Sequence, residues 1–171
     1  VVMRWANYQR GPDALSPSDQ ASKNNPDYVA ANTGTANLFV GPGAGSTGIS
    51  GYGNAAFGPS ALSSNTAGER NSAFGNLALR TNTLGFQNSA FGWHSLQANS
   101  TGIKNSAFGD SALGYNTTGS YNSAFGQTAL GYNTTGSVNS AFGQNALFSN
   151  TTGSSNSGFG EGALVSNTTG A

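Results

Sequence analysis

Cysteine is absent from this 171-residue sequence, so neither disulfide bonds nor thiolate metal sites can stabilise its fold. Charge is also scarce, because six basic and six acidic residues make up only 7% of the chain and cancel to a formal net charge of zero. Such a chain has no net field to attract nucleic acid or an anionic membrane, and we expect neither partner. No stretch reaches the roughly 18 to 20 apolar residues of a transmembrane helix, so membrane insertion is not expected.

The sequence also lacks any clear set of acid, base and nucleophile. His94 is the only histidine, and it has no neighbouring cluster of acidic residues that could form a zinc site or a hydrolytic triad. The run 43–48 matches the Gly-x-Gly-x-x-Gly spacing of dinucleotide sites, but it lacks the strand, helix and acidic residue that such sites need. We therefore predict no catalytic, cofactor-binding or metal-binding residues, and a protein that is not an enzyme.

What the sequence has in abundance is repetition. Each copy contains Asn-Ser-Ala-Phe-Gly, an Ala-Leu pair and a turn such as Asn-Thr-Thr-Gly. Gly and Asn tolerate the positive φ of turns, and a helix is disfavoured because the poor helix formers Gly, Asn, Ser and Thr are abundant and no apolar period of 3.6 runs through the copies. Each copy therefore predicts a coil of strand, turn, strand, turn. The eight copies follow one another every 17 residues, beginning at Asn37, Asn54, Asn71, Asn88, Asn105, Asn122, Asn139 and Asn156.

One such coil cannot be stable alone. Ordering its backbone costs about 1 to 2 kcal/mol per residue, whereas burying its Phe and Leu returns roughly 1.5 to 3 kcal/mol each. The coils must therefore stack, with parallel strands about 4.8 Å apart, and we predict an all-β parallel β-solenoid of 17-residue, two-strand coils. The predicted core consists of two ladders: Phe57, Phe74, Phe91, Phe108, Phe125, Phe142 and Phe159, with Leu62, Leu79, Leu96, Leu113, Leu130, Leu147 and Leu164 opposite.

The same repeat predicts association between chains. Ala73 and Phe74 are adjacent, as are Ala78 and Leu79, so a strand would turn the members of each pair to opposite faces. If Phe and Leu fill the interior, columns of small Ala side chains face outwards and suit close approach of another surface. If the reverse holds, apolar Phe or Leu columns are exposed and need a partner. Both arrangements favour association, and a monomeric solenoid is the alternative.

The repeated Asn-Ser-Ala-Phe-Gly, with its short spacer and Gly-ended turn, resembles the Asn-Ser-(Val)-Ala-Ile-Gly repeat in the head domains of YadA-like trimeric autotransporter adhesins. It is equally similar to the Asn-Thr-Ala-Phe-Gly and Asn-Thr-Thr-Gly arrays of phage tail or capsid fibres and of large bacterial surface proteins. The resemblance covers residues 37–171 and implies a left-handed parallel β-roll with three chains packed about one axis. It therefore implies a structural or adhesive fibre module, a homotrimer, on the surface of a virion or a bacterial cell.

Residues 1–36 lack the period and form a separate predicted segment before the repeat domain, residues 37–171. An open solenoid end exposes unpaired strand edges, so a cap is expected there. The alternative is a connector that makes end-to-end contacts with a neighbouring fibre subunit.

Four aromatic side chains that interrupt the repeat are candidates for recognition of a cell-surface receptor or glycan. Trp93 and His94 stand where other copies carry small polar or acidic residues, and Tyr115 and Tyr132 occupy the same position in adjacent copies. The alternatives are a variable surface turn for the first pair and a stabilising ring ladder for the second. Two columns of threonine suggest an alternative function, an ice-binding solenoid. They are Thr117, Thr134, Thr151 and Thr168, and beside them Thr118, Thr135, Thr152 and Thr169.

Overall fold

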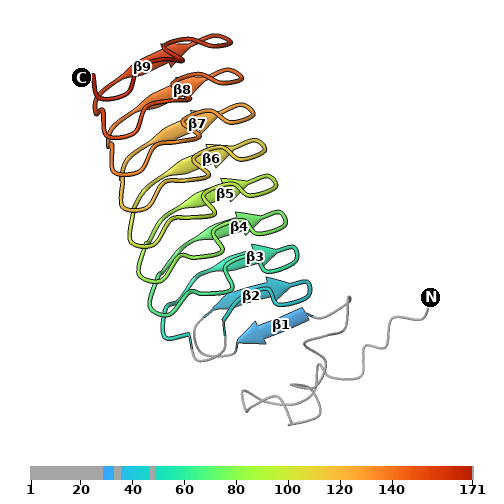
Figure 1. Ribbon diagram of the computed structural model, residues 1–171. Coiled ribbons are helices and arrows are strands. Elements are labelled where there is room, and N and C mark those ends of the chain that lie inside the picture. Colours follow the sequence, from blue (N-terminus) through green and yellow to red (C-terminus); the bar gives the residue numbers. More distant parts are fainter. Residues whose placement is uncertain (1–28, 33–35, 47–48, 171) are drawn as a thin grey trace, which may run out of the picture.

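The fold is a stack of coils with a single sheet along one side (Figure 1). This computed structural model describes residues 29–32, 36–46 and 49–170. The strands of the described residues are short and follow one another in the sheet in chain order. They are β1 (Val29–Asn32), β2 (Asn37–Val40), β3 (Ala55–Phe57), β4 (Ser72–Phe74), β5 (Ser89–Phe91), β6 (Ser106–Phe108), β7 (Ser123–Phe125), β8 (Ser140–Phe142) and β9 (Ser157–Phe159).

Strands β2 to β9 are parallel and keep one register throughout. Ala56 pairs with Ala73, and Ala73 pairs with Ala90, so each residue lies beside its equivalent in the next copy of the repeat. Hydrogen bonds between equivalent side chains therefore join residues 17 positions apart. The predicted class, an all-β parallel β-solenoid with a 17-residue coil, is confirmed.

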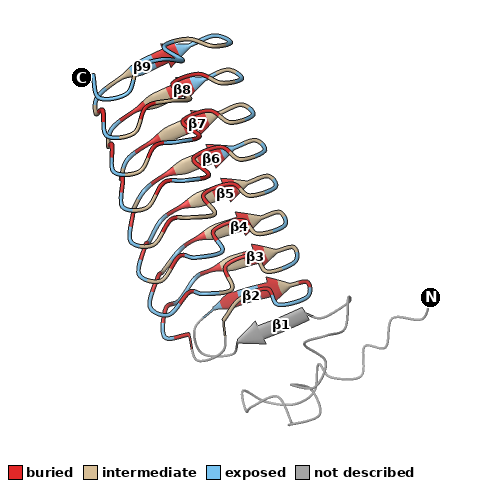
Figure 2. Cartoon of the chain, in the orientation of Figure 1, coloured by how far each residue is buried: buried red, intermediate tan, exposed pale blue. Residues whose placement is uncertain are grey.

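Side chains alternate between the two faces of the sheet, and the alternation places phenylalanine outside. In β4, Ala73 is fully buried, whereas Ser72 and Phe74 on either side of it are partly exposed (Figure 2). The interior has room for little more than a methyl group here, since a Cβ added to Gly158, the equivalent of Ala73, would lie 3.2 Å from Leu147 Cγ. The prediction that the phenylalanines form a core ladder is therefore wrong, and the outward column consists of Phe57, Phe74, Phe91, Phe108, Phe125, Phe142 and Phe159.

The second predicted strand of each coil is also wrong, because the Ala-Leu pair lies in a turn. Leu113 has a φ of 51°, in the left-handed region, and Gly114 N–H donates to the carbonyl of Ser111 at 3.0 Å. This turn breaks the alternation of a strand, so that Ala112 and Leu113 are both fully buried. Leu164, in the last described coil, is half exposed. The fully buried leucines with the same left-handed conformation are Leu62, Leu79, Leu96, Leu113, Leu130 and Leu147.

A column of buried asparagines runs beside the start of each strand. Asn71 Nδ2 donates to Asn54 Oδ1 at 3.1 Å and to the carbonyl of Gly85 at 2.9 Å. Its Oδ1 accepts from the backbone N–H and the side-chain amide of Asn88, at 3.0 and 3.2 Å. Every polar group of the side chain is therefore paired, which removes the usual penalty of burying an amide. This strand asparagine column comprises Asn37, Asn54, Asn71, Asn88, Asn105, Asn122, Asn139 and Asn156.

A second asparagine column lies in the Gly-ended turns. Asn116 Nδ2 donates to Asn99 Oδ1 at 2.9 Å and to the carbonyl of Gly119 at 3.0 Å. A Cβ on Gly119 would lie only 2.4 Å from Asn116 Oδ1 and 2.3 Å from the carbonyl oxygen of Gly136, so the repeat needs glycine there. Within the described residues, no buried side-chain N or O atom lacks a partner. This turn asparagine column comprises Asn65, Asn82, Asn99, Asn116, Asn133, Asn150 and Asn167.

At the N-terminal end of the sheet, β1 pairs antiparallel with β2, Val29 lying beside Val40. Residues 1–28 and 33–35, which make up most of the segment expected to be a cap or connector, lie outside the described residues. Both readings of that segment therefore stay predictions. In the glycine-rich run, Gly43 and Gly45 have a φ of 68°, as expected for turn glycines, and residues 47–48 lie outside the described part.

Candidate functional site

The outer face of the sheet carries a continuous column of stacked phenylalanine rings. Centroids of neighbouring rings are 4.7 to 5.1 Å apart, and the ring planes differ by 3 to 12°. Stacking covers the flat faces of each ring but leaves an edge in solvent, so that Phe108, in the middle of the column, is still 36% exposed. An apolar strip therefore runs along the outer face of the described sheet.

Serines beside the phenylalanines keep this face uncharged. Four of the six charged side chains of residues 37–171 lie on its two flanks, and Glu69 and Arg80 stand at other positions of the repeat. We call one edge of this face the leading flank. It is formed by the residues that stand two positions before each strand, immediately ahead of the column asparagine, and its charged members are Arg70 and Lys104. The opposite edge is the trailing flank. It is formed by the second residue after each strand, and its charged members are Asp110 and Glu161. All four of these side chains are exposed. One flank therefore carries only cations and the other only anions.

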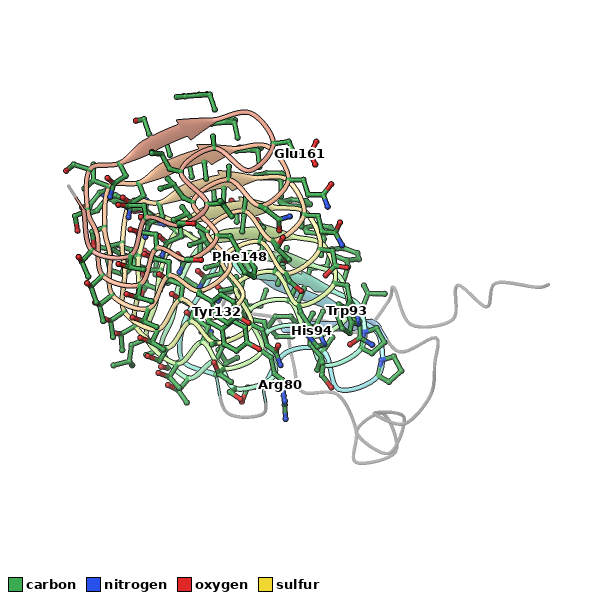
Figure 3. All side chains as sticks on the ribbon, turned by 45° about the horizontal axis from the view of Figure 1, so that its top comes forward. Arg80, Trp93, His94, Tyr132, Phe148 and Glu161 are labelled. Carbon is green, nitrogen blue, oxygen red and sulfur yellow. The ribbon has the colours of Figure 1, made fainter. Side chains whose placement is uncertain are left out.

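Two of the predicted recognition residues form a stacked pair in the loop after β5. The indole of Trp93 lies against the imidazole of His94, with ring centroids 3.5 Å apart. Trp93 is 52% exposed, and both residues project from the same loop (Figure 3). Trp93 stands on the trailing flank, at the position of Asp110 in the next coil. The pair offers a flat aromatic surface, and its role in recognition stays a prediction.

The other two predicted residues also stack, and a third aromatic residue joins them. Tyr115 and Tyr132 have ring centroids 5.1 Å apart, and Phe148 meets Tyr132 edge-on at 4.7 Å. The ring of Phe148 lies over Gly131, because a Cβ on that glycine would be 3.1 Å from it. The sequence analysis missed Phe148, although the glycines at its equivalent positions in the two preceding copies are the signal that could have found it. The candidates thus fall into two ring pairs, which no ring contact joins.

The asparagines of five Asn-x-Ser/Thr sequences belong to the turn asparagine column. Their side-chain amides are used within the protein, as Asn133 shows by donating to Asn116 Oδ1 at 2.8 Å and to the carbonyl of Gly136 at 2.9 Å. The sequence pattern predicts that these asparagines lie in turns, but it does not indicate that their side chains are buried. These asparagines therefore serve to join coils in the folded protein.

No group of three or more His, Cys, Asp and Glu side chains that could hold a metal ion occurs among the described residues. That part of the chain also contains no helix long and apolar enough to cross a membrane. Comparisons with protein-family models, with curated proteins and with solved structures give no match. The class of protein is defined by the fold itself: a parallel β-solenoid with 17-residue coils and two asparagine columns.

Proposed function

We propose that this chain is a non-enzymatic structural module of an extracellular fibre, assembled as a homotrimer on a virion or a bacterial cell surface. The observation that carries the proposal is the outward phenylalanine column, because a contiguous apolar strip usually marks an interface. The resemblance of the repeat to adhesin head repeats and phage fibre repeats supports the trimeric state and the extracellular location.

The bonding between coils suits a rigid spacer. Backbone hydrogen bonds, the two asparagine columns and hydroxyl groups all join each coil to the next; Thr134 Oγ1, for example, donates to the carbonyl of Thr151 at 2.9 Å. Each added coil repeats the same contacts, so length increases without a change of shape. In this function the rod holds a recognition element away from the surface that bears it. The two aromatic pairs are candidates to contact a receptor or glycan directly.

Sedimentation of the purified chain tests the assembly. We expect a trimer mass for the unmodified chain and a monomer mass for the double variant Phe91→Ser/Phe125→Ser. Serine replaces an apolar ring on the outer face with a polar side chain and leaves the buried alanines in place, so the far-UV circular dichroism should not change. The matched control is Tyr115→Ser/Tyr132→Ser, which removes two exposed rings from outside the sheet and should remain a trimer. A monomer mass for the unmodified chain at all concentrations would overturn the assembly.

The location is tested separately with antibodies against the repeat domain. Labelling of intact particles or cells from the source, seen by electron microscopy, is the expected result. Labelling that appears only after the cells are opened contradicts an extracellular fibre.

An ice-binding solenoid is the second candidate, supported by an exposed row of threonines at one position of the coil. These are Thr118, Thr135, Thr152 and Thr169. The neighbouring threonine column is less suitable, because Thr117 Oγ1 and its equivalents donate to backbone carbonyls of the next coil. Of the two threonine columns, therefore, only one has hydroxyls that are not used within the fold. Thermal hysteresis of the purified protein above that of an inert protein would favour this function over the fibre.

A further inference from the structure

The two flanks of the phenylalanine face carry opposite charges within one coil. Lys104 precedes β6 and Asp110 follows it, so their Cα atoms are separated by six residues, at most about 20 Å of extended chain. Lys104 Nζ lies 5.1 Å from the ring centroid of Tyr121, and Asp110 accepts a hydrogen bond from Ser111 Oγ at 2.7 Å. Neither side chain forms an ion pair with another side chain of the described residues. Both charges are therefore available to a partner at the edges of the apolar strip.

Symmetry decides which flanks meet when two copies bring their phenylalanine faces together. If the rods are parallel and related by rotation about an axis along their length, the leading flank of one copy meets the trailing flank of the next. Lys104 then faces the Asp110 of its neighbour, within the same coil of an in-register pair. If the rods are antiparallel, each flank meets its own equivalent, and cations face cations while anions face anions. Like charges at close range are unfavourable, so the distribution favours the parallel arrangement.

The spacing of the rings adds a second, independent argument for a copy of this chain as the partner. Rings repeat every 4.7 to 5.1 Å along the strip, and only a surface with the same repeat can place a side chain against each of them. A second copy of this chain has the same ring spacing, because it has the same fold. The in-register arrangement also opposes the full length of both columns, whereas any shift along the rod leaves rings at both ends uncovered.

We propose that copies of this chain bind one another through the phenylalanine face as parallel, in-register rods, with Lys104 of each copy paired with Asp110 of the next. This inference rests on the proposed self-assembling fibre and adds the direction and register of its chains. Phenylalanine provides the apolar contact, and the charges on the two flanks favour the parallel over the antiparallel arrangement.

Single cysteines test the direction and register, because the natural chain contains none. Ser72→Cys in β4 and Ser140→Cys in β8 place a thiol on the outer face at equal distances from β6. The two variants, one carrying a size tag, are mixed, unfolded and refolded together, and then treated with a short bismaleimide. Parallel in-register rods give cross-links within each variant, 72 to 72 and 140 to 140, and none between 72 and 140. Antiparallel rods centred on β6 give only the 72 to 140 product.

Charge reversal tests the predicted ion pair in the same assembly. Lys104→Glu or Asp110→Lys alone should raise the dissociation constant by about two- to five-fold, and the double variant should restore it. The control is Arg80→Glu, which reverses an exposed cation outside both flanks and should leave the dissociation constant unchanged.

The outcomes separate the inference from the function on which it rests. A 72 to 140 cross-link overturns the parallel in-register arrangement and the three-fold assembly with it, because rods related by a three-fold axis along their length all run in one direction. A trimer without a cross-link in either variant overturns only the contact through the phenylalanine face. Single variants without effect, or a double variant as weak as the single ones, overturn the Lys104–Asp110 pair. A sample that sediments as a monomer before cross-linking overturns the assembly itself.

Discussion

At the residue scale, asparagine side chains join each coil of this repeat to the next. The side chain carries two N–H donors and an acceptor oxygen, so each asparagine can donate to the copy before it and accept from the copy after it. In the turn column, Asn116 Nδ2 donates to Asn99 Oδ1, and Asn133 Nδ2 donates to Asn116 Oδ1, so the amides all point the same way. Such aligned chains of hydrogen bonds polarise one another and strengthen as they lengthen. A carboxylate of the same shape could not take part, because it has no donor.

Asn116→Asp is therefore expected to lower the free energy of unfolding by about 3 kcal/mol or more at neutral pH. The substitution puts a buried carboxylate against two acceptors and removes the donor that both of them share. Asn99 Oδ1 loses its hydrogen bond, and the carbonyl of Gly119 keeps only the one from Asn105 Nδ2. Urea denaturation followed by circular dichroism measures the effect. Thr118→Asp, which adds the same charge at an exposed position two residues away, should change stability by less than about 0.5 kcal/mol. Equal losses in the two variants would contradict the role assigned to the asparagine columns.

At the element scale, the coil differs from the sequence prediction because its two apolar segments adopt different conformations. The Ser-Ala-Phe segment is a strand, whereas the Ala-Leu segment contains a left-handed residue, Leu113 in the fifth copy. The residue type gives no sign of the left-handed conformation, because leucine is rare at positive φ and a buried leucine fits a strand equally well. The distinction has a measurable consequence, because branching at Cβ is favourable in strands and unfavourable at positive φ.

We accordingly expect Leu113→Ile to be about 1 kcal/mol less stable than Leu113→Met. Both substitutions keep the buried volume nearly constant, so each should cost less than about 1.5 kcal/mol for packing alone. Isoleucine must in addition hold a β-branched side chain at a φ near 51°, where crowding at its branched Cβ costs roughly 1 kcal/mol beyond what leucine and methionine already pay. Thermal or urea unfolding of the two variants gives the difference directly. An isoleucine variant at least as stable as the methionine variant would indicate a strand at this position.

The sequence predicted the coil length, the stacking and the parallel sheet, because a strict period leaves each residue only its own equivalent as a neighbour. It also indicated that Phe57 would stack on Phe74 and that Tyr115 would stack on Tyr132, as they do. It could not give the side of the sheet on which the phenylalanines lie, since Ala and Phe are both apolar and the alternation has two phases. The burial of the asparagines was missed for a similar reason: the same residue suits an exposed turn and a buried amide column.

At the scale of the whole molecule, equal coils make stability a sum of similar contributions from neighbouring copies. Each coil contacts the coil before it and the coil after it through the same hydrogen bonds; Asn105, for example, donates to Asn88 Oδ1 just as Asn88 donates to Asn71 Oδ1. Removing one whole coil should therefore bring two equivalent surfaces together. Removing part of a coil should not, because the asparagine columns and the sheet would no longer be in register.

A chain lacking residues 88–104 is expected to fold with an unfolding temperature only a few degrees lower, because one set of repeated contacts is lost and the rest are rebuilt. In that chain Asn105 takes the place of Asn88 above Asn71, and Phe108 stacks on Phe74. A chain lacking only residues 88–96 keeps more sequence but leaves no whole number of coils between Asn71 and Asn105, so the copies on one side of the deletion should unfold at a much lower temperature. Circular dichroism melting curves and small-angle scattering compare the two. If the shorter deletion is as stable as the longer one, the coils are not the units of this fold, since only a whole coil restores every hydrogen bond between asparagines.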